Sequence, residues 1–286
     1  MSFDDFRRQA WRDHNDDAAG VATRWCEGMS LVETEAQIAP FVALIAHVMG
    51  EHLARWDEGV DALQDLRGLR AYAQDGESEK AIARSIAWLK LGGGVERALD
   101  TLSLSDQVYA LCFLASAMNW QAQTERAERH FRAALEKARP GFAKGDGANR
   151  ALALAGNNIA FGLEQKPDRS PYQTELMVLA AETGLKYWEA PEDILMGEYR
   201  LAMSYTQAGR LDDALAHAKA HNKGAENAGP LEQFYGCQVR ATVEHARKDA
   251  AELEKAQGRA RKVFQELSNH EKAQNRDALE KLLALN

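Results

Sequence analysis

The chain has 286 residues, of which 45% are hydrophobic and 27% are charged. These values are ordinary for a globular protein and exclude a disordered chain. The net charge of −8 argues against duplex binding, because a protein that binds a duplex needs a basic face to displace the counterions of the phosphates. We therefore expect no nucleic-acid partner.

Three cysteines, Cys26, Cys112 and Cys237, lie far apart and show no metal-ligand spacing, which is typical of thiols in a reducing compartment. The first residues are polar and charged, unlike a signal peptide. The most apolar segment, 38–50, contains Pro40 and is too short to span a bilayer. The sequence therefore predicts a soluble, cytoplasmic protein with no membrane segment.

Residues that favour helices dominate the composition, and runs of valine, isoleucine and threonine are nearly absent. We expect an all-α protein with N-terminal helices over 1–37 and helical hairpins over 38–268. The first hairpin covers 44–66 and breaks near Ala54. The second covers 80–102, with Gly92 to Gly94 as its turn.

The third hairpin covers 111–140 and stops before Pro140. The fourth joins 151–165 to 174–188 through a loop that holds Pro167 and Pro171. The fifth covers 201–220, and the sixth joins 231–249 to 250–267. A charged capping helix is expected over 269–286.

The fifth hairpin shows the pattern most clearly. Gly209 stands where a helix must end in a left-handed residue, which costs glycine little. Asp212 and Asp213 fall in the first turn of the next helix, where negative charge suits the dipole. Ala202 and Ala214 are small where two antiparallel helices must approach closely. The segment is therefore predicted to contain the end of one helix and the start of the next.

Six hairpins at intervals of about 30–46 residues are typical of a helical solenoid. The sequence resembles the tetratricopeptide repeat family in two segments. The matching residues are Leu201, Ala202, Tyr205, Gly209, Ala214 and Leu215 in one repeat, and Leu114, Ala115, Ala127, Phe131, Ala134 and Pro140 in the other, with a weaker match around His47, Trp56 and Gly59. The resemblance implies a right-handed α-α superhelix, one solenoid domain over 1–286, whose concave groove binds peptides or proteins.

Two histidine pairs invite comparison with metal sites. His47 and His52 lie five residues apart, which places them about 140° apart around an α-helix, so both cannot address one ion. His217 and His221 have a four-residue step suited to zinc, but no third ligand is indicated.

Acidic pairs such as Asp212–Asp213 lack the third carboxylate of a magnesium cluster, and they suit helix N-termini. Gly92 to Gly94 lacks the lysine of a phosphate-binding loop. We therefore predict no metal, no cofactor and no catalytic residues.

The free face of the first helices gives a candidate partner-binding groove, with aromatic anchors beside amide and guanidinium donors. It consists of Arg84, Trp88, Tyr109, Asn119, Trp120, Asn157, Phe161, Tyr199 and Gln207. The leading hypothesis is a non-catalytic adaptor that holds a peptide or protein there. The alternatives are a sensor of a small molecule or peptide that acts through a partner protein, and an enzyme whose site is not visible in sequence. A homodimer through the terminal hairpins stays open, and so does an inner core made of the same aromatic residues.

Overall fold

The computed structural model describes all residues, 1–286, and contains helices but no strand. The all-α prediction is confirmed. The chain divides into two compact units, Met1–Ala155 and Gly156–Asn286, and each is described by itself. Helix α9 (Gly147–Glu164) holds the last residues of the first unit and the first residues of the second. The expected single domain over 1–286 stays a prediction.

The first unit starts with three short helices and continues with longer ones that pack as sequence neighbours. They are α1 (Phe3–Asp13), α2 (Ala18–Ala22), α3 (Trp25–Ser30), α4 (Glu35–Ala46), the π-helix η1 (His47–His52), α5 (Trp56–Asp65), the 3₁₀ turn η2 (Leu66–Gly68), α6 (Glu77–Gly92), α7 (Leu104–Trp120) and α8 (Thr124–Lys137). Helix α6 packs against α4, α5 and α7, and α7 packs along α8. These contacts enclose one continuous hydrophobic core.

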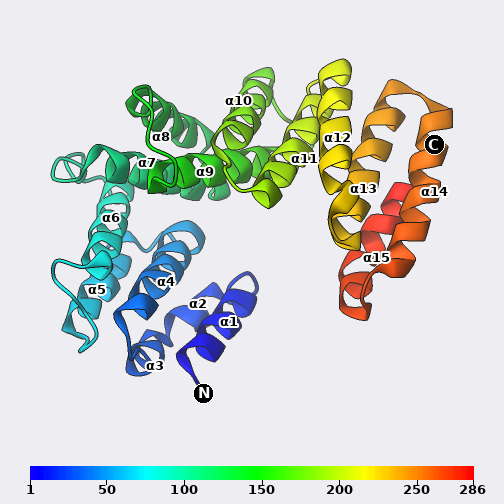
Figure 1. The fold of residues 1–286 in the computed structure, drawn as a ribbon. Coiled ribbons are helices and arrows are strands. Elements are labelled where there is room, and N and C mark those ends of the chain that lie inside the picture. Colours follow the sequence, from blue (N-terminus) through cyan, green and yellow to red (C-terminus); the bar gives the residue numbers. More distant parts are fainter. The chain divides into compact units, whose positions relative to one another are not determined.

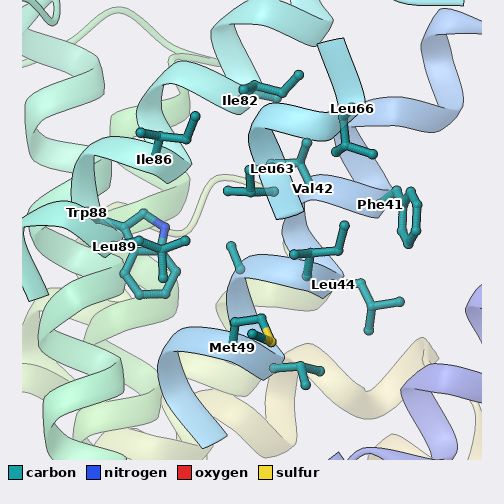
Figure 2. Close-up of a cluster of buried hydrophobic side chains, with 14 of the residues drawn as sticks. Phe41, Val42, Leu44, Met49, Leu63, Leu66, Ile82, Ile86, Trp88 and Leu89 are labelled. Carbon is teal, nitrogen blue, oxygen red and sulfur yellow. The ribbon is translucent and has the colours of Figure 1, made fainter. Parts of the chain in front are cut away.

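The core of the first unit is drawn in Figure 2. Its labelled side chains are Phe41, Val42 and Leu44 from α4, Met49 from η1, Leu63 from α5, Leu66 from η2, and Ile82, Ile86, Trp88 and Leu89 from α6. Met49 is 3% exposed, so the π-helical turn is anchored in this core by its own side chain. The turn is therefore part of the packed structure of the unit.

The second unit contains six more helices after α9. They are α10 (Pro171–Tyr187), α11 (Pro191–Gln207), α12 (Leu211–Gly224), α13 (Pro230–Arg247), α14 (Ala250–Glu266) and α15 (Asn269–Leu283), with a 3₁₀ turn η3 (Ala225–Asn227) before α13. Helices α11 to α14 lie side by side in chain order, and each packs against the next one (Figure 1). No helix in either unit is both long enough and apolar enough to cross a membrane.

Local sequence explains where several helices start. The side chains of Ser2, Ser170 and Ser268 each accept a hydrogen bond from the backbone N–H three residues later, and the side-chain oxygen of that later residue accepts one from the serine N–H. These reciprocal capping boxes satisfy donors that the first turn leaves open. Pro171 is the first residue of α10, where its missing N–H costs nothing, so it does not lie in the preceding loop as expected.

The expected hairpin turns are found at three positions. Gly209 has a φ of 74° between α11 and α12, and Ala54 has a φ of 51° between η1 and α5. Ala122, with a φ of 59°, separates α7 from α8. Ala202 and Ala214 are fully buried, as their role in close helix approach requires.

The second expected hairpin is wrong in its second half. After α6, residues 95–102 form successive turns instead of a helix, with bonds such as Ala98 N–H to the Val95 carbonyl at 3.1 Å. Leu99 and Leu102 pack on the core from these turns. Because α6 already packs against α4, α5 and α7, it needs no partner helix directly after it. The first hairpin also starts earlier than expected, because α4 begins at Glu35.

Candidate metal centre

Immediately after α4 the backbone widens into the π-helix η1. The Leu53 N–H donates to the Val48 carbonyl, five positions back, at 3.1 Å. In such a ladder one turn takes about one more residue than in an α-helix, so positions five apart lie on the same face. His47 and His52 are therefore brought together, with their Nε2 atoms 3.0 Å apart. The expectation that these two imidazoles cannot address one ion rested on α-helical geometry and is wrong for this segment.

Contacts from neighbouring helices hold the π-helix in place. Gly50 lies so close to the ring of Trp88 that an added Cβ would come within 2.3 Å of a ring carbon. The Gln121 side-chain amide donates to the Gly50 carbonyl at 2.6 Å and to the Glu51 carbonyl at 3.2 Å. Carbonyls that the widened turn leaves without a helical partner are thereby satisfied. The π-helix is thus fixed by α6 and by the residue after α7.

A third histidine completes the cluster. His14 is the residue that ends α1, and it is 7% exposed. Its ring centroid lies 5.0 Å from that of His47 and 4.8 Å from that of His52. One ligand atom from each of the three histidines lies within 4.8 Å of the others. A tetrahedral zinc ion holds its nitrogen ligands about 3.3 Å apart, so small side-chain rotations would bring all three into coordination.

Hydrogen bonds on the outer side of the cluster fix two of the rings. The His14 Nδ1–H donates to the Trp11 carbonyl at 2.8 Å, and the His47 Nδ1–H donates to the Glu51 carboxylate at 3.2 Å. Both acceptors require the proton on Nδ1, so Nε2 is the unprotonated nitrogen in each neutral ring, and that of His47 accepts from the His52 Nε2–H at 3.0 Å. Metal-binding histidines in proteins carry this same kind of outer partner, a carboxylate or a backbone carbonyl.

Burial lowers the pKa of two of the three histidines. Desolvation, followed by the nearby His47 and His14, lowers the pKa of His52 to about 4. Desolvation also lowers the pKa of His14, against the opposing effect of the bond to the Trp11 carbonyl. A metal ion needs imidazole nitrogens without a proton, and because the His52 Nε2–H donates to His47 Nε2, a cation entering the cluster would have to displace that proton.

Two tryptophans flank the three imidazoles. The Trp11 ring lies 5.1 Å from the His47 ring, and the Trp120 ring lies 5.1 Å from the His52 ring, centroid to centroid. Trp11 is 36% exposed and Trp120 is 57% exposed, so the cluster lies close to the surface. Trp120, predicted as a groove residue, therefore belongs to the surroundings of this cluster.

Glu51 is expected to act as a positioning residue for His47. Replacing it by alanine removes the acceptor that orients the ring, and zinc affinity should fall about 10–100-fold. The zinc affinity of Glu51→Gln should lie between those of wild type and Glu51→Ala, because the glutamine amide oxygen can still accept a hydrogen bond from the His47 Nδ1–H. The matched control is Glu58→Ala, an exposed carboxylate that pairs with Arg55. Competition with a chromophoric chelator measures the zinc affinities of the wild type and the three variants, and equal values for Glu51→Ala and wild type would contradict this role.

The other groove candidates of the first unit lie in different surroundings. Trp88 is 2% exposed and Asn119 is 6% exposed, so the expectation that they line an open groove is wrong. Trp88 packs edge-on against Trp56 in the core, with ring centroids 6.3 Å apart. Arg84 lies over the ring of Tyr109, with its guanidinium carbon 4.0 Å from the ring centroid.

In the second unit, three candidates gather around Arg200. The Arg200 guanidinium donates to Asn157 at 3.3 Å and lies over the ring of Phe161. Tyr199, its neighbour on α11, lies 6.0 Å from the His221 ring. Gln207 is the exposed last residue of α11.

The pair His217 and His221 divides between two environments. His217 Nδ1 bonds the Glu198 carboxylate at 2.6 Å, whereas His221 is buried beside Tyr199. The pair is not among the groups of three or more residues with converging ligand atoms.

Comparisons with protein-family models, curated proteins and solved structures found no match to this chain. The chain is an all-helical protein whose first unit carries a candidate three-histidine metal centre.

Proposed function

We propose that the first unit binds one divalent transition-metal ion through the Nε2 atoms of His14, His47 and His52. The observation that supports this most strongly is the convergence of three imidazoles, two of which are held by outer hydrogen bonds from Nδ1. Imidazole ligands suit zinc, copper, iron and nickel, and zinc takes three histidines readily. Zinc is the ion we expect.

Three protein ligands leave one position of a tetrahedral ion for water or an added ligand, as in catalytic zinc sites. Glu51 is already engaged by His47, so it serves as an outer partner and leaves that position open. Trp11 and Trp120 supply aromatic surface beside it. The centre would then hold a metal that can accept a small anion or a neutral donor.

A cobalt titration tests the proposal. Full-length protein treated with chelator and dialysed should bind one equivalent of Co²⁺, with a dissociation constant on the order of 1 µM or tighter. Visible d–d bands should grow to a sharp endpoint and shift on addition of azide or imidazole, which would occupy the open position. The triple variant His14→Ala, His47→Ala, His52→Ala should lose this binding. If the wild-type protein binds Co²⁺ only weakly and without saturation, or if the triple variant gives the same endpoint, the cluster is only a hydrogen-bonded part of the core.

The finer description of the fold is also a proposal. A tetratricopeptide-like superhelix is supported by the left-handed Gly209 and by the buried Ala202 and Ala214 between α11 and α12. A cytoplasmic location is supported by Cys26, Cys112 and Cys237, none of which forms a disulfide. The adaptor and sensor hypotheses are supported by a hollow in the second unit.

A further inference from the structure

A hollow of about 430 Å³ opens between α11, α12 and α13 in the second unit. Its lining includes Glu192, Met196, Tyr199, His221, Glu232 and Tyr235. None of these residues takes part in the histidine cluster, which lies in the first unit. The hollow is therefore a separate candidate site with its own chemistry.

Aromatic and apolar side chains form much of the wall. The Tyr199 and Tyr235 rings lie 6.2 Å apart at 65°, and the His221 ring lies 6.0 Å from Tyr199. Met196 is 39% exposed at the same hollow. Such a wall suits the methylene stem of a long side chain and offers ring faces to a cation.

The positive charge in the wall is already neutralised. Arg200 forms an ion pair with the buried Glu164, bonds Asn157 and lies over Phe161. His221 is the other basic group, and desolvation lowers its pKa, so it is neutral at pH 7. The hollow therefore has no uncommitted cation with which to hold an anionic ligand.

Two carboxylates of the wall have no cation as a partner. They are Glu192 and Glu232, and Glu232 is the more enclosed of the two. Burial raises the pKa of Glu232 because desolvation disfavours its charged form, and a cation placed beside it would favour that form. A carboxylate excess beside two tyrosine rings is complementary to an organic cation.

We propose that the hollow takes a lysine or arginine side chain of an extended peptide, with its charged end at Glu232 and its stem against Tyr199 and Tyr235. Glu192 and Met196 are exposed, so the peptide main chain can continue past them. This is a peptide-binding site beyond the metal centre, and it gives the adaptor hypothesis one defined contact.

The test uses full-length protein with chelator present, so that metal binding plays no part. The probes are acetylated pentapeptide amides with glycine at four positions and lysine, arginine, norleucine or glutamate at the centre, together with butylammonium. Calorimetry or NMR titration should show that the lysine and arginine peptides bind at least about tenfold more tightly than the norleucine peptide. The glutamate peptide should not bind.

Glu232→Gln decides the outcome, because it keeps the size of the side chain and removes its charge. The substitution should lower the affinity for the lysine peptide about tenfold and leave the helical content unchanged. Glu226→Gln, an exposed position elsewhere in the second unit, should bind as wild type does. Equal affinity for norleucine, or an unaffected Glu232→Gln, would overturn the proposal. Butylammonium binding as tightly as the lysine peptide would assign the hollow to small amines and overturn the peptide part.

Discussion

Replacing His52 by alanine should lower the affinity of the protein for zinc by at least about 100-fold. The change removes one of three ligands, which should cost more than the loss of an outer partner. Zinc at 100 times its dissociation constant should stabilise the wild-type protein by about 2.7 kcal/mol, and at the same concentration it should barely stabilise the variant. Competition titration and thermal unfolding with and without zinc measure the two effects.

His270→Ala is the matched control for this experiment, because His270 is exposed and lies in the second unit, outside the cluster. It should keep the affinity and the stabilisation of the wild-type protein. If His52→Ala and His270→Ala hold zinc equally well, the three histidines do not form the binding site.

Replacing Gly50 by alanine lowers the free energy of unfolding by about 1–3 kcal/mol. The new Cβ would stand 2.3 Å and 2.5 Å from two ring carbons of Trp88, which is 2% exposed and has little room to move. To remove this steric clash the π-helix must shift, and the shift would move His47 relative to His52. Zinc affinity should therefore fall together with stability, although Gly50 offers no ligand.

Gly68→Ala is the comparison, because nothing lies within 4 Å of its added Cβ. Its free energy of unfolding should stay the same or rise by less than about 1 kcal/mol. Urea unfolding of both variants separates the contact with Trp88 from the general effect of losing a glycine. A Gly50→Ala protein as stable as Gly68→Ala would mean that the π-helix is not held in the way described.

Local signals in the sequence were sufficient for much of the fold. The turn at Gly209 and the break near Ala54 are confirmed, because both depend on residues within one or two turns of helix. The segment 95–102 is not helical, and this could not be predicted from local pattern. Its apolar residues Leu99 and Leu102 pack against the core of the first unit, which is built by helices distant in sequence.

The histidine cluster escaped prediction for a physical reason. An α-helical period separates His47 from His52, and only a wider turn brings them together. That turn is held by Trp88 and Gln121, which lie on other parts of the chain. His14 lies at the end of α1, and no sequence spacing relates it to His47 or His52. The isolated Gly50 between the histidines was the one local hint of a close approach.

The groove residues show the same dependence on packing. Trp88 was placed on a free face of its helix, but α6 is surrounded by α4, α5 and α7 and keeps that side chain in the core. Tyr199 was placed at a recognition surface and does line a hollow. Which face stays open is decided by the neighbours of a helix, and the sequence of the helix alone does not contain them.

X-ray absorption spectroscopy of the zinc-loaded, full-length protein tests the three-histidine centre most directly. The predicted spectrum contains three imidazole rings and one further nitrogen or oxygen atom at about 2.0–2.1 Å from the metal. A sulfur shell at about 2.3 Å, or a fit with fewer than two imidazole rings, would contradict the assignment of the ion to His14, His47 and His52.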